Sequence, residues 1–326
     1  MADTRALIYG FTVDAAGRVT ELDWASLNQL NTRDEGRWCW IHMNRLSPET
    51  QSWLRRVGAP DELVLAALLQ DDTRPRIVRH EDGFLLNLRG VNLNPGAHPE
   101  DMISLRMWAT HRCVITTRAH RILATEDVRD QFRAGTPPQG TGSLITMIAK
   151  QLVARMSPVI SELDERVDDI EEQLLSTNAS TSRTGISAFR RTVLTLRRYL
   201  APQREALAGF LRDADDFLIG EDRNSLRDTQ DALVRLLEDL DMIRERALLL
   251  QEQLVEERAE AMNDRLFVLS IISAIFLPLG FITGLFGVNV GGMPGVENNL
   301  AFVVLCVGMG LFALLIVWLF RRLKWI

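Results

Sequence analysis

The sequence has little cysteine and little histidine, and neither is arranged to bind a metal. Cys39, Cys113 and Cys306 are odd in number and form no CxxC pair. Because this usage is typical of a reducing cytosol, we expect free thiols and neither a disulfide nor a zinc-ribbon framework. The histidines form no HxxxH or HExxH pair, which argues against a dedicated zinc cage. His42 alternates with apolar residues in a strand-like stretch, so we interpret it as a structural residue.

The sequence also lacks the motifs of nucleotide-driven and nucleophilic chemistry. No GxxxxGKS/T loop, GxGxxG fingerprint or GxSxG elbow occurs. We therefore expect no enzyme, no bound cofactor and no ATP. The formal net charge is −6, and the part before residue 266 is still more acidic, which disfavours nucleic acid as a partner.

Charged residues are absent from two long apolar runs, Leu266–Phe286 and Leu300–Phe320. At ~1.5 Å rise per residue, each run forms a helix of roughly 31 Å, which matches the hydrocarbon core of a bilayer. The mean hydropathy of +0.00 is thus the average of an aqueous part and a membrane part. A purely soluble enzyme is excluded, and the first residues do not resemble a signal peptide.

The distribution of charge around the two runs predicts their orientation. The loop between them, residues 287–299, has no Lys or Arg and one acid, Glu297. The tail, residues 321–326, contains Arg321, Arg322 and Lys324. By the positive-inside rule the tail is cytoplasmic, and two crossings place the N-terminal part on the same side. The basic residues would anchor the protein to anionic lipid at the cytoplasmic surface.

The N-terminal part, residues 1–140, alternates strand-like and helix-like stretches and predicts an α/β domain. Strands are expected at Arg37–Met43, Phe84–Leu93 and Asp101–Thr117, with hairpin turns at Asp82-Gly83 and His111-Arg112. Helices are expected at Asp61–Gln70 and His120–Phe132. The stretch GTPPQGTG, residues 135–142, is a credible domain boundary.

Helical periodicity dominates after this boundary. Residues 141–220 predict two antiparallel helices, one from Leu144 to Leu174 and one from Gly185 to Leu218 that is bent or broken at Pro202. Residues 221–265 carry leucines at heptad spacing and continue without Gly or Pro into the first apolar run, so a stalk helix should be continuous with a membrane helix.

Two charged helix faces need an interpretation. The acidic face of the first helix is either solvated, which we favour, or a regulatory metal site between subunits; it comprises Asp164, Asp168, Asp169, Glu171 and Glu172. An arginine cluster on the second helix should pair with these acids; it comprises Arg190, Arg191, Arg197, Arg198 and Arg204.

Small and weakly polar residues recur every three or four positions along the first apolar run, and therefore share one helix face. With its cytoplasmic extension this face comprises Asn263, Leu266, Ser270, Ser273, Leu277, Gly280 and Gly284. Periodicity alone favours a helix-packing face. The alternative is a pore lining, which needs several copies in a closed ring because two crossings cannot enclose a water-filled path.

The end of this run shifts the balance towards a pore. Gly287-Val288-Asn289 resembles the Gly-Val-Asn variant of the Gly-Met-Asn signature of CorA-type divalent cation transporters, and the continuation VGGMPG resembles their ZntB branch of zinc transporters. The stretches TRPR (73–76) and RRYLAPQR (197–204) and the strand WCWIHMN resemble the same branch. The resemblance covers essentially the whole chain.

This resemblance implies a funnel-shaped homopentamer of the bacterial inner membrane that transports Zn²⁺ and has no cofactor. Five Asn289 side chains would bind a hydrated, transiently held cation at the outer pore mouth, and the stripe from Asn263 to Gly284 would line the pore. Leu266 and Leu277 would gate it by dewetting. Glu297 in five copies would attract cations, and the alternative is a solvated loop acid. The family favours proton-coupled zinc uptake; a magnesium or broad divalent channel and zinc efflux are the alternatives.

Overall fold

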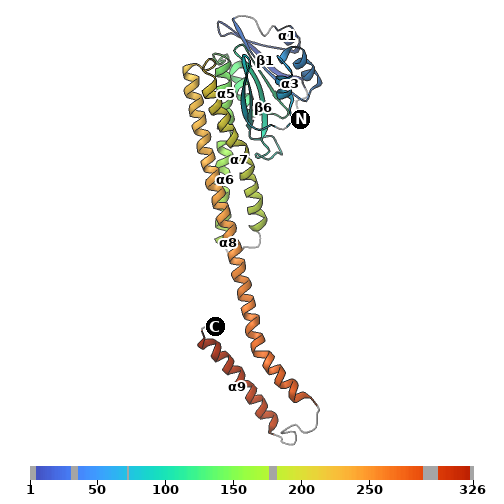
Figure 1. Ribbon diagram of the computed structural model, residues 1–326, viewed down its shortest axis with the longest axis vertical. Coiled ribbons are helices and arrows are strands. Elements are labelled where there is room, and N and C mark those ends of the chain that lie inside the picture. Colours follow the sequence, from blue (N-terminus) through green and yellow to red (C-terminus); the bar gives the residue numbers. More distant parts are fainter. Residues whose placement is uncertain (1–4, 31–35, 72, 176–181, 289–299, 324–326) are drawn as a thin grey trace. The chain divides into compact units, whose positions relative to one another are not determined.

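A computed structural model describes residues 5–30, 36–71, 73–175, 182–288 and 300–323 (Figure 1). The chain divides into two compact units, Met1–Gln251 and Glu252–Ile326. The first unit contains the sheet, the shorter helices and the beginning of α8, while the second contains the remainder of α8 and helix α9. The expected class is therefore observed: an α/β N-terminal part, long helices and a C-terminal apolar helix.

The sheet has seven strands in the order β2-β1-β3-β7-β6-β5-β4, and only the β3–β7 pair among the described strands is parallel. The predicted strands β3, β5, β6 and β7 are confirmed, as is the turn at His111-Arg112. The β4–β5 turn consists of Glu81-Asp82, one residue earlier than predicted, because Gly83 already pairs with His80. Strands β1, β2 and β4 were not predicted. The bounds are β1 (Leu7–Asp14), β2 (Val19–Glu21), β3 (Arg37–Asn44), β4 (Arg76–His80), β5 (Gly83–Gly90), β6 (Ile103–Thr110) and β7 (Cys113–Arg118).

Helices cover both faces of this sheet. On one face, Cys39, Ile41 and Met43 of β3 pack in a core cluster with α1 (Trp24–Gln29), α2 (Pro48–Trp53), η1 (Leu54–Gly58) and α3 (Glu62–Leu69). On the other face lie α4 (Leu123–Arg133), α5 (Thr141–Ala154) and α7 (Ser182–Asp213), with ring contacts from Trp40 to Phe132 and from Phe84 to Phe210. Because helices cover both faces, strands β5 to β7 are buried on both sides, and their sequences are mostly apolar without strict alternation.

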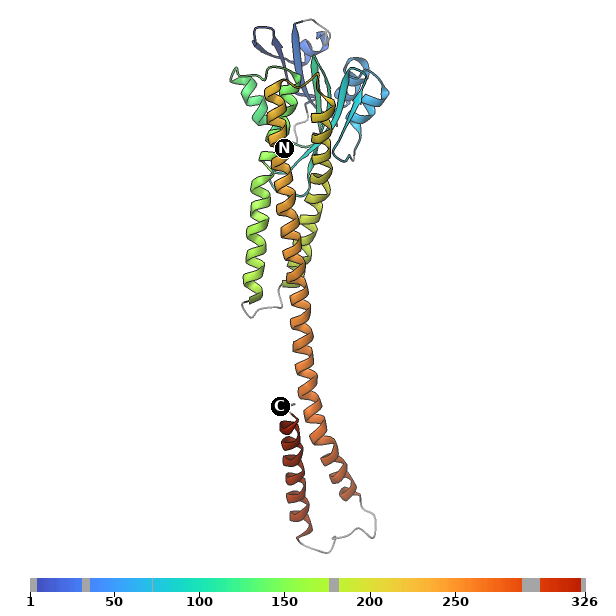
Figure 2. The ribbon, with the colours of Figure 1, turned by 60° about the vertical axis from the view of Figure 1, so that its left-hand side comes forward.

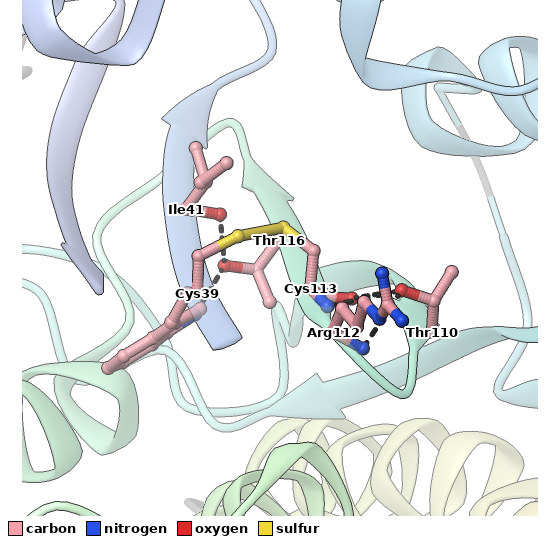
Figure 3. Close-up of a disulfide and its surroundings, with 7 residues drawn as sticks. Cys39, Ile41, Thr110, Arg112, Cys113 and Thr116 are labelled. Carbon is pink, nitrogen blue, oxygen red and sulfur yellow. Dashed lines mark hydrogen bonds between the residues drawn. A yellow bond between two sulfur atoms is a disulfide. The ribbon is translucent and has the colours of Figure 1, made fainter. Parts of the chain in front are cut away.

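The expectation of free thiols is wrong for two of the three cysteines. Cys39 and Cys113 form a disulfide, with a Cα–Cα separation of 4.6 Å (Figure 3). They are directly opposite one another in the parallel pairing of β3 with β7, so the register itself brings the two side chains together. Both cysteines are buried in the core cluster, while Cys306 is free and exposed.

His42 is a buried core residue, as predicted. Its ring stacks on Tyr9 at a centroid distance of 4.6 Å, and its Nδ1 lies 2.7 Å from the Thr116 hydroxyl. Burial, followed by the positive charges of Arg118 and Arg129, holds the pKa of His42 well below its ordinary value. The imidazole is therefore neutral at physiological pH.

The first predicted long helix is in fact two helices, α5 and α6 (Ser157–Leu175). The break at Arg155–Met156 precedes Pro158, whose missing N–H and ring disfavour a continuous helix through this turn. Helix α7, by contrast, continues through Pro202.

Helix α8 (Gly220–Gly287) confirms the prediction of one unbroken helix that enters the first apolar run. Figures 1 and 2 show α6, α7 and the first half of α8 side by side. The heptad residues Leu226, Leu233, Leu240 and Ala247 are almost completely buried. The leucine seam of α8 is thus filled by the chain's own helices.

Candidate functional site

The stripe of small residues lies on a single helix face. All seven residues of the predicted stripe belong to α8, which stays helical from Gly220 to Gly287. At 100° per residue, the positions from Leu266 to Gly284 fall within an arc of roughly 80°. The structure therefore brings these residues into one line along the helix.

Hydroxyl groups near this face donate to the helix backbone. The Ser270 hydroxyl donates to the Leu266 carbonyl at 2.7 Å, and the Thr283 hydroxyl donates to the Gly280 carbonyl at 3.0 Å. The single proton of each hydroxyl is used, so the oxygen lone pairs remain as acceptors. Such a surface accepts hydrogen bonds from the water shell of a cation and offers it no charged ligand.

A backbone acceptor that was not predicted from the sequence lies beside this stripe. Pro278 lies inside α8, and a proline has no N–H to donate to the carbonyl four residues earlier. The carbonyl of Ala274 therefore lacks its usual intrahelical hydrogen bond. The signal was present in the sequence, as a proline within the first apolar run.

The signature tripeptide begins where α8 ends. Gly287 is the last residue of the helix, and Val288, which follows it, is exposed. Asn289, Glu297 and Lys324 lie outside the described residues. Helix α9 (Ala301–Arg322) ends on Arg321 and Arg322, with the Arg322 guanidinium 5.3 Å from the centre of the Trp318 ring. An arginine and a tryptophan together are typical of a helix end at the membrane–water interface.

The apolar parts of α8 and α9 are not buried by this chain. Both helices are long and apolar enough to cross a membrane, and the most apolar stretch of each helix is unburied in the single chain. Leu277, at the centre of the stripe, is 75% exposed. These surfaces need lipid or further copies of the chain to cover them.

The charged faces of the helical bundle are paired differently from the prediction. The acids of α6 contact Arg246 of α8, with Nη2–Oε2 at 2.8 Å for Glu171 and Nη1–Oδ1 at 3.3 Å for Asp164. Asp168 also contacts Arg246, and hydrogen bonds to Glu171 and Asp168 raise the pKa of that arginine. The predicted pairing of these acids with the α7 arginines is wrong for Arg197, which binds Asp241 of α8 at 2.5 Å. Helix register, which the sequence alone does not fix, decides the partners.

A buried arginine that the sequence interpretation missed connects the TRPR and RRYLAPQR stretches. Arg89 of β5 donates from Nε and Nη2 to the Thr73 carbonyl at 3.1 and 2.8 Å, and from Nη1 to the Met102 carbonyl at 2.8 Å. Its guanidinium lies 4.0 Å from the centre of the Tyr199 ring. Its backbone N–H donates to Oε1 of Gln203 at 2.7 Å. Arg89 thus joins strand β5 to both stretches.

An α/β unit, a long helix with a charge-free small-residue face and a second apolar helix together define the CorA-like architecture of membrane ion transporters. The chain belongs to this family: the model described as CorA-like Mg²⁺ transporter protein matches residues 35–322.

Known relatives match along almost the whole chain. The Divalent cation transporter CmaX of Pseudomonas aeruginosa is 36% identical over 99% of this chain and 98% of its own, and the structure of the full-length CmaX protein superposes with a TM-score of 0.84, covering 99% of both chains. The Zinc transport protein ZntB of Yersinia enterocolitica is 30% identical over 98% of this chain and 96% of its own. The CorA magnesium transporter of Methanocaldococcus jannaschii, at 19% identity, shares the fold with a TM-score of 0.81 over 98% and 99% of the two chains.

Proposed function

We propose that this chain transports divalent cations across the inner membrane through the central pore of a homopentamer, and that zinc moving into the cytoplasm is its main substrate. The observation that carries the proposal is the uncharged stripe of α8, which is exposed in the single chain and leads directly to Gly287 and Val288. The chain's membership of the CorA-like family and its similarity to CmaX and ZntB support cation transport.

The pore chemistry follows from the donors on the stripe. Five copies of Ser270 and Ser273 form rings of hydroxyl oxygens, and five copies of Asn289 form a ring of amide oxygens at the outer mouth. Oxygens of this kind bind water protons of a hydrated cation without the strong grip of a carboxylate, so the ion can leave again. Leu266 and Leu277 form apolar rings that close the path by dewetting.

The ends of the two membrane helices supply the charge. Glu297 in five copies raises the local cation concentration at the outer mouth. Arg321, Arg322 and Lys324 form a basic ring at the cytoplasmic surface, where they bind anionic lipid and fix both termini in the cytoplasm. No Asp, Glu, His, Lys or Arg occurs in either apolar run, and the one thiol there is Cys306 of the second run. The proton coupling that we propose therefore uses water and uncharged groups rather than a carboxylate relay.

Zinc is proposed from the VGGMPG sequence after α8 and from the similarity to ZntB, which is named as a zinc transport protein. The more similar CmaX is named for divalent cations in general, which favours a broad divalent channel as the second candidate. The polar groups on the described part of the stripe offer oxygen acceptors to the water shell of a cation. This pore chemistry is compatible with a zinc transporter and with a broad divalent channel.

A thiol-reactive block tests the pore assignment. In a Cys306→Ser background, Ser273→Cys places a thiol on the stripe, and Ile271→Cys places one on the opposite side of the same helix. A charged, membrane-impermeant methanethiosulfonate reagent should stop metal flux into proteoliposomes through the Ser273→Cys protein and leave the Ile271→Cys protein active. Equal inhibition of both, or of neither, would contradict a pore lined by this face.

A further inference from the structure

A group of metal-ligand side chains lies in the α/β unit, on elements other than α8. Asp61, His80 and Glu81 each offer one ligand atom, and the three atoms lie within 4.8 Å of one another. Asp61 precedes α3, while His80 and Glu81 end β4 and begin the turn to β5. Residues separated by about twenty positions are thus brought together by tertiary packing.

Asp61 is held by the start of α3. One carboxylate oxygen, Oδ1, accepts the N–H of Val64 at 2.9 Å and caps the helix. The other oxygen, Oδ2, lies 2.5 Å from Nε2 of His80. The cap fixes the direction of the carboxylate, and a hydrogen bond of this kind orients a metal-binding carboxylate in known sites.

His80 is oriented by the edge of the sheet. Successive side chains of β4 point to opposite faces, and Arg79 binds Asp216 beside α7, so His80 faces α3. Its ring makes an edge contact with Trp108, with centroids 6.2 Å apart. Gly83 keeps the hairpin close to β6, since a Cβ there would lie 2.5 Å from the Ala109 carbonyl oxygen. The imidazole is therefore placed before any ion binds.

Glu81 completes the group from an unusual backbone conformation. Its φ of 46° is the only positive value at a non-glycine residue in the described part of the chain. This left-handed region is unfavourable for a residue with a Cβ. Within the same described ranges, the Glu81 carboxylate makes no hydrogen bond or ion pair, so it is available as a third ligand.

We propose that Asp61, His80 and Glu81 form a zinc-binding site in the α/β unit that ties the start of α3 to the β4–β5 hairpin. One imidazole nitrogen and two carboxylate oxygens suit zinc, with water in the fourth position. Tetrahedral bonds of ~2.0–2.2 Å place the donor atoms about 3.3–3.6 Å apart, which requires only small side-chain movements from the present group. Zinc binds the lone pair of His80 Nε2, and the imidazole then carries its proton on Nδ1.

The donor set also predicts which cations are rejected. Magnesium requires near-octahedral oxygen coordination and retains its waters, so an imidazole ligand does not suit it. Cobalt(II), by contrast, accepts the same nitrogen and oxygen ligands. The site should therefore bind zinc in a large excess of magnesium.

The test is zinc binding to the purified full-length chain in detergent, in an Asn289→Ala background so that the outer pore ring does not contribute. Isothermal titration calorimetry in excess magnesium should show that one zinc ion binds per chain. Glu81→Gln and Asp61→Asn should each lower the zinc affinity at least tenfold. Asparagine keeps the helix cap, so the second change removes the ligand and not the helix start. Glu62→Gln, a neighbouring carboxylate outside the group, should stay within twofold of the parent.

A fourth variant separates binding from folding. Glu81→Gly relieves the left-handed backbone and removes the ligand, so the protein should unfold at an equal or higher temperature and still lose the zinc site. The visible absorption of bound cobalt(II) should disappear in the same variants. Zinc affinity and cobalt spectra unchanged by Glu81→Gln, Asp61→Asn and Glu81→Gly would overturn the proposal, and would leave the transport proposal untouched.

Discussion

Replacing Arg89 by alanine should destabilise the α/β unit more than any exposed arginine does. The change removes three hydrogen bonds from a buried guanidinium to the carbonyls of Thr73 and Met102, and its contact with the Tyr199 ring. Two buried carbonyls without donors cost about 1–3 kcal/mol each, and the lost cation–π contact adds about 1 kcal/mol, so we expect a loss of about 3–7 kcal/mol. That is a large part of the ~5–15 kcal/mol by which a domain is stable.

The measurement is urea unfolding of the full chain in detergent, followed by tryptophan fluorescence. Arg121→Ala is the matched control, because Arg121 forms an exposed ion pair with Glu126 and its loss should cost less than about 1 kcal/mol. Arg89→Lys keeps the positive charge but not the planar guanidinium. Its loss of unfolding free energy should therefore lie between those of Arg121→Ala and Arg89→Ala. An Arg89→Ala protein as stable as the Arg121→Ala protein would refute the role of Arg89 in joining the two stretches to β5.

Three further predictions follow from the described side chains. The oxidised, denatured chain should react with one equivalent of a thiol reagent, at Cys306, and with three after reduction; three before reduction would contradict the Cys39–Cys113 disulfide. The pKa of His42 is lowered in the folded protein, so below pH ~6.5 the imidazole takes up a proton in the unfolded chain and not in the folded one. Between pH 7.5 and 5.5 the free energy of unfolding of the wild type should therefore fall by about 1.4 kcal/mol more than that of His42→Phe. Equal losses in the two proteins would disprove this. Leu277→Asn should increase zinc flux into proteoliposomes relative to Leu277→Ile by wetting the proposed apolar ring, and unchanged flux would argue against that ring.

The long elements were predictable because their signals are local. The heptad leucines of α8 and the absence of a breaker before Pro278 predict the helix that is observed. The missed break between α5 and α6 also had a local signal, in Pro158. The small-residue stripe could be found in the same way, since helical periodicity alone brings its members to one face.

Features that depend on distant pairing could not be predicted in this way. Cys39 and Cys113 are 74 residues apart, and only the parallel pairing of β3 with β7 brings them together. The partners of Arg246 and Arg197 depend on the register of three packed helices. Arg89 lies in a strand that is buried on both faces, where its charge gave no sign of the carbonyls that it would bind.

The most direct test of the central claim is metal entry into proteoliposomes that contain the purified full-length protein, with zinc and magnesium compared at equal concentration. The account predicts zinc entry that increases with an inward proton gradient, persists in excess magnesium and falls sharply in Asn289→Ala while the oligomer remains assembled. Equal entry of both metals that is indifferent to the gradient would instead establish a passive divalent channel. Zinc entry that is unchanged by Asn289→Ala would contradict the role of the Gly287-Val288-Asn289 mouth in the transport path.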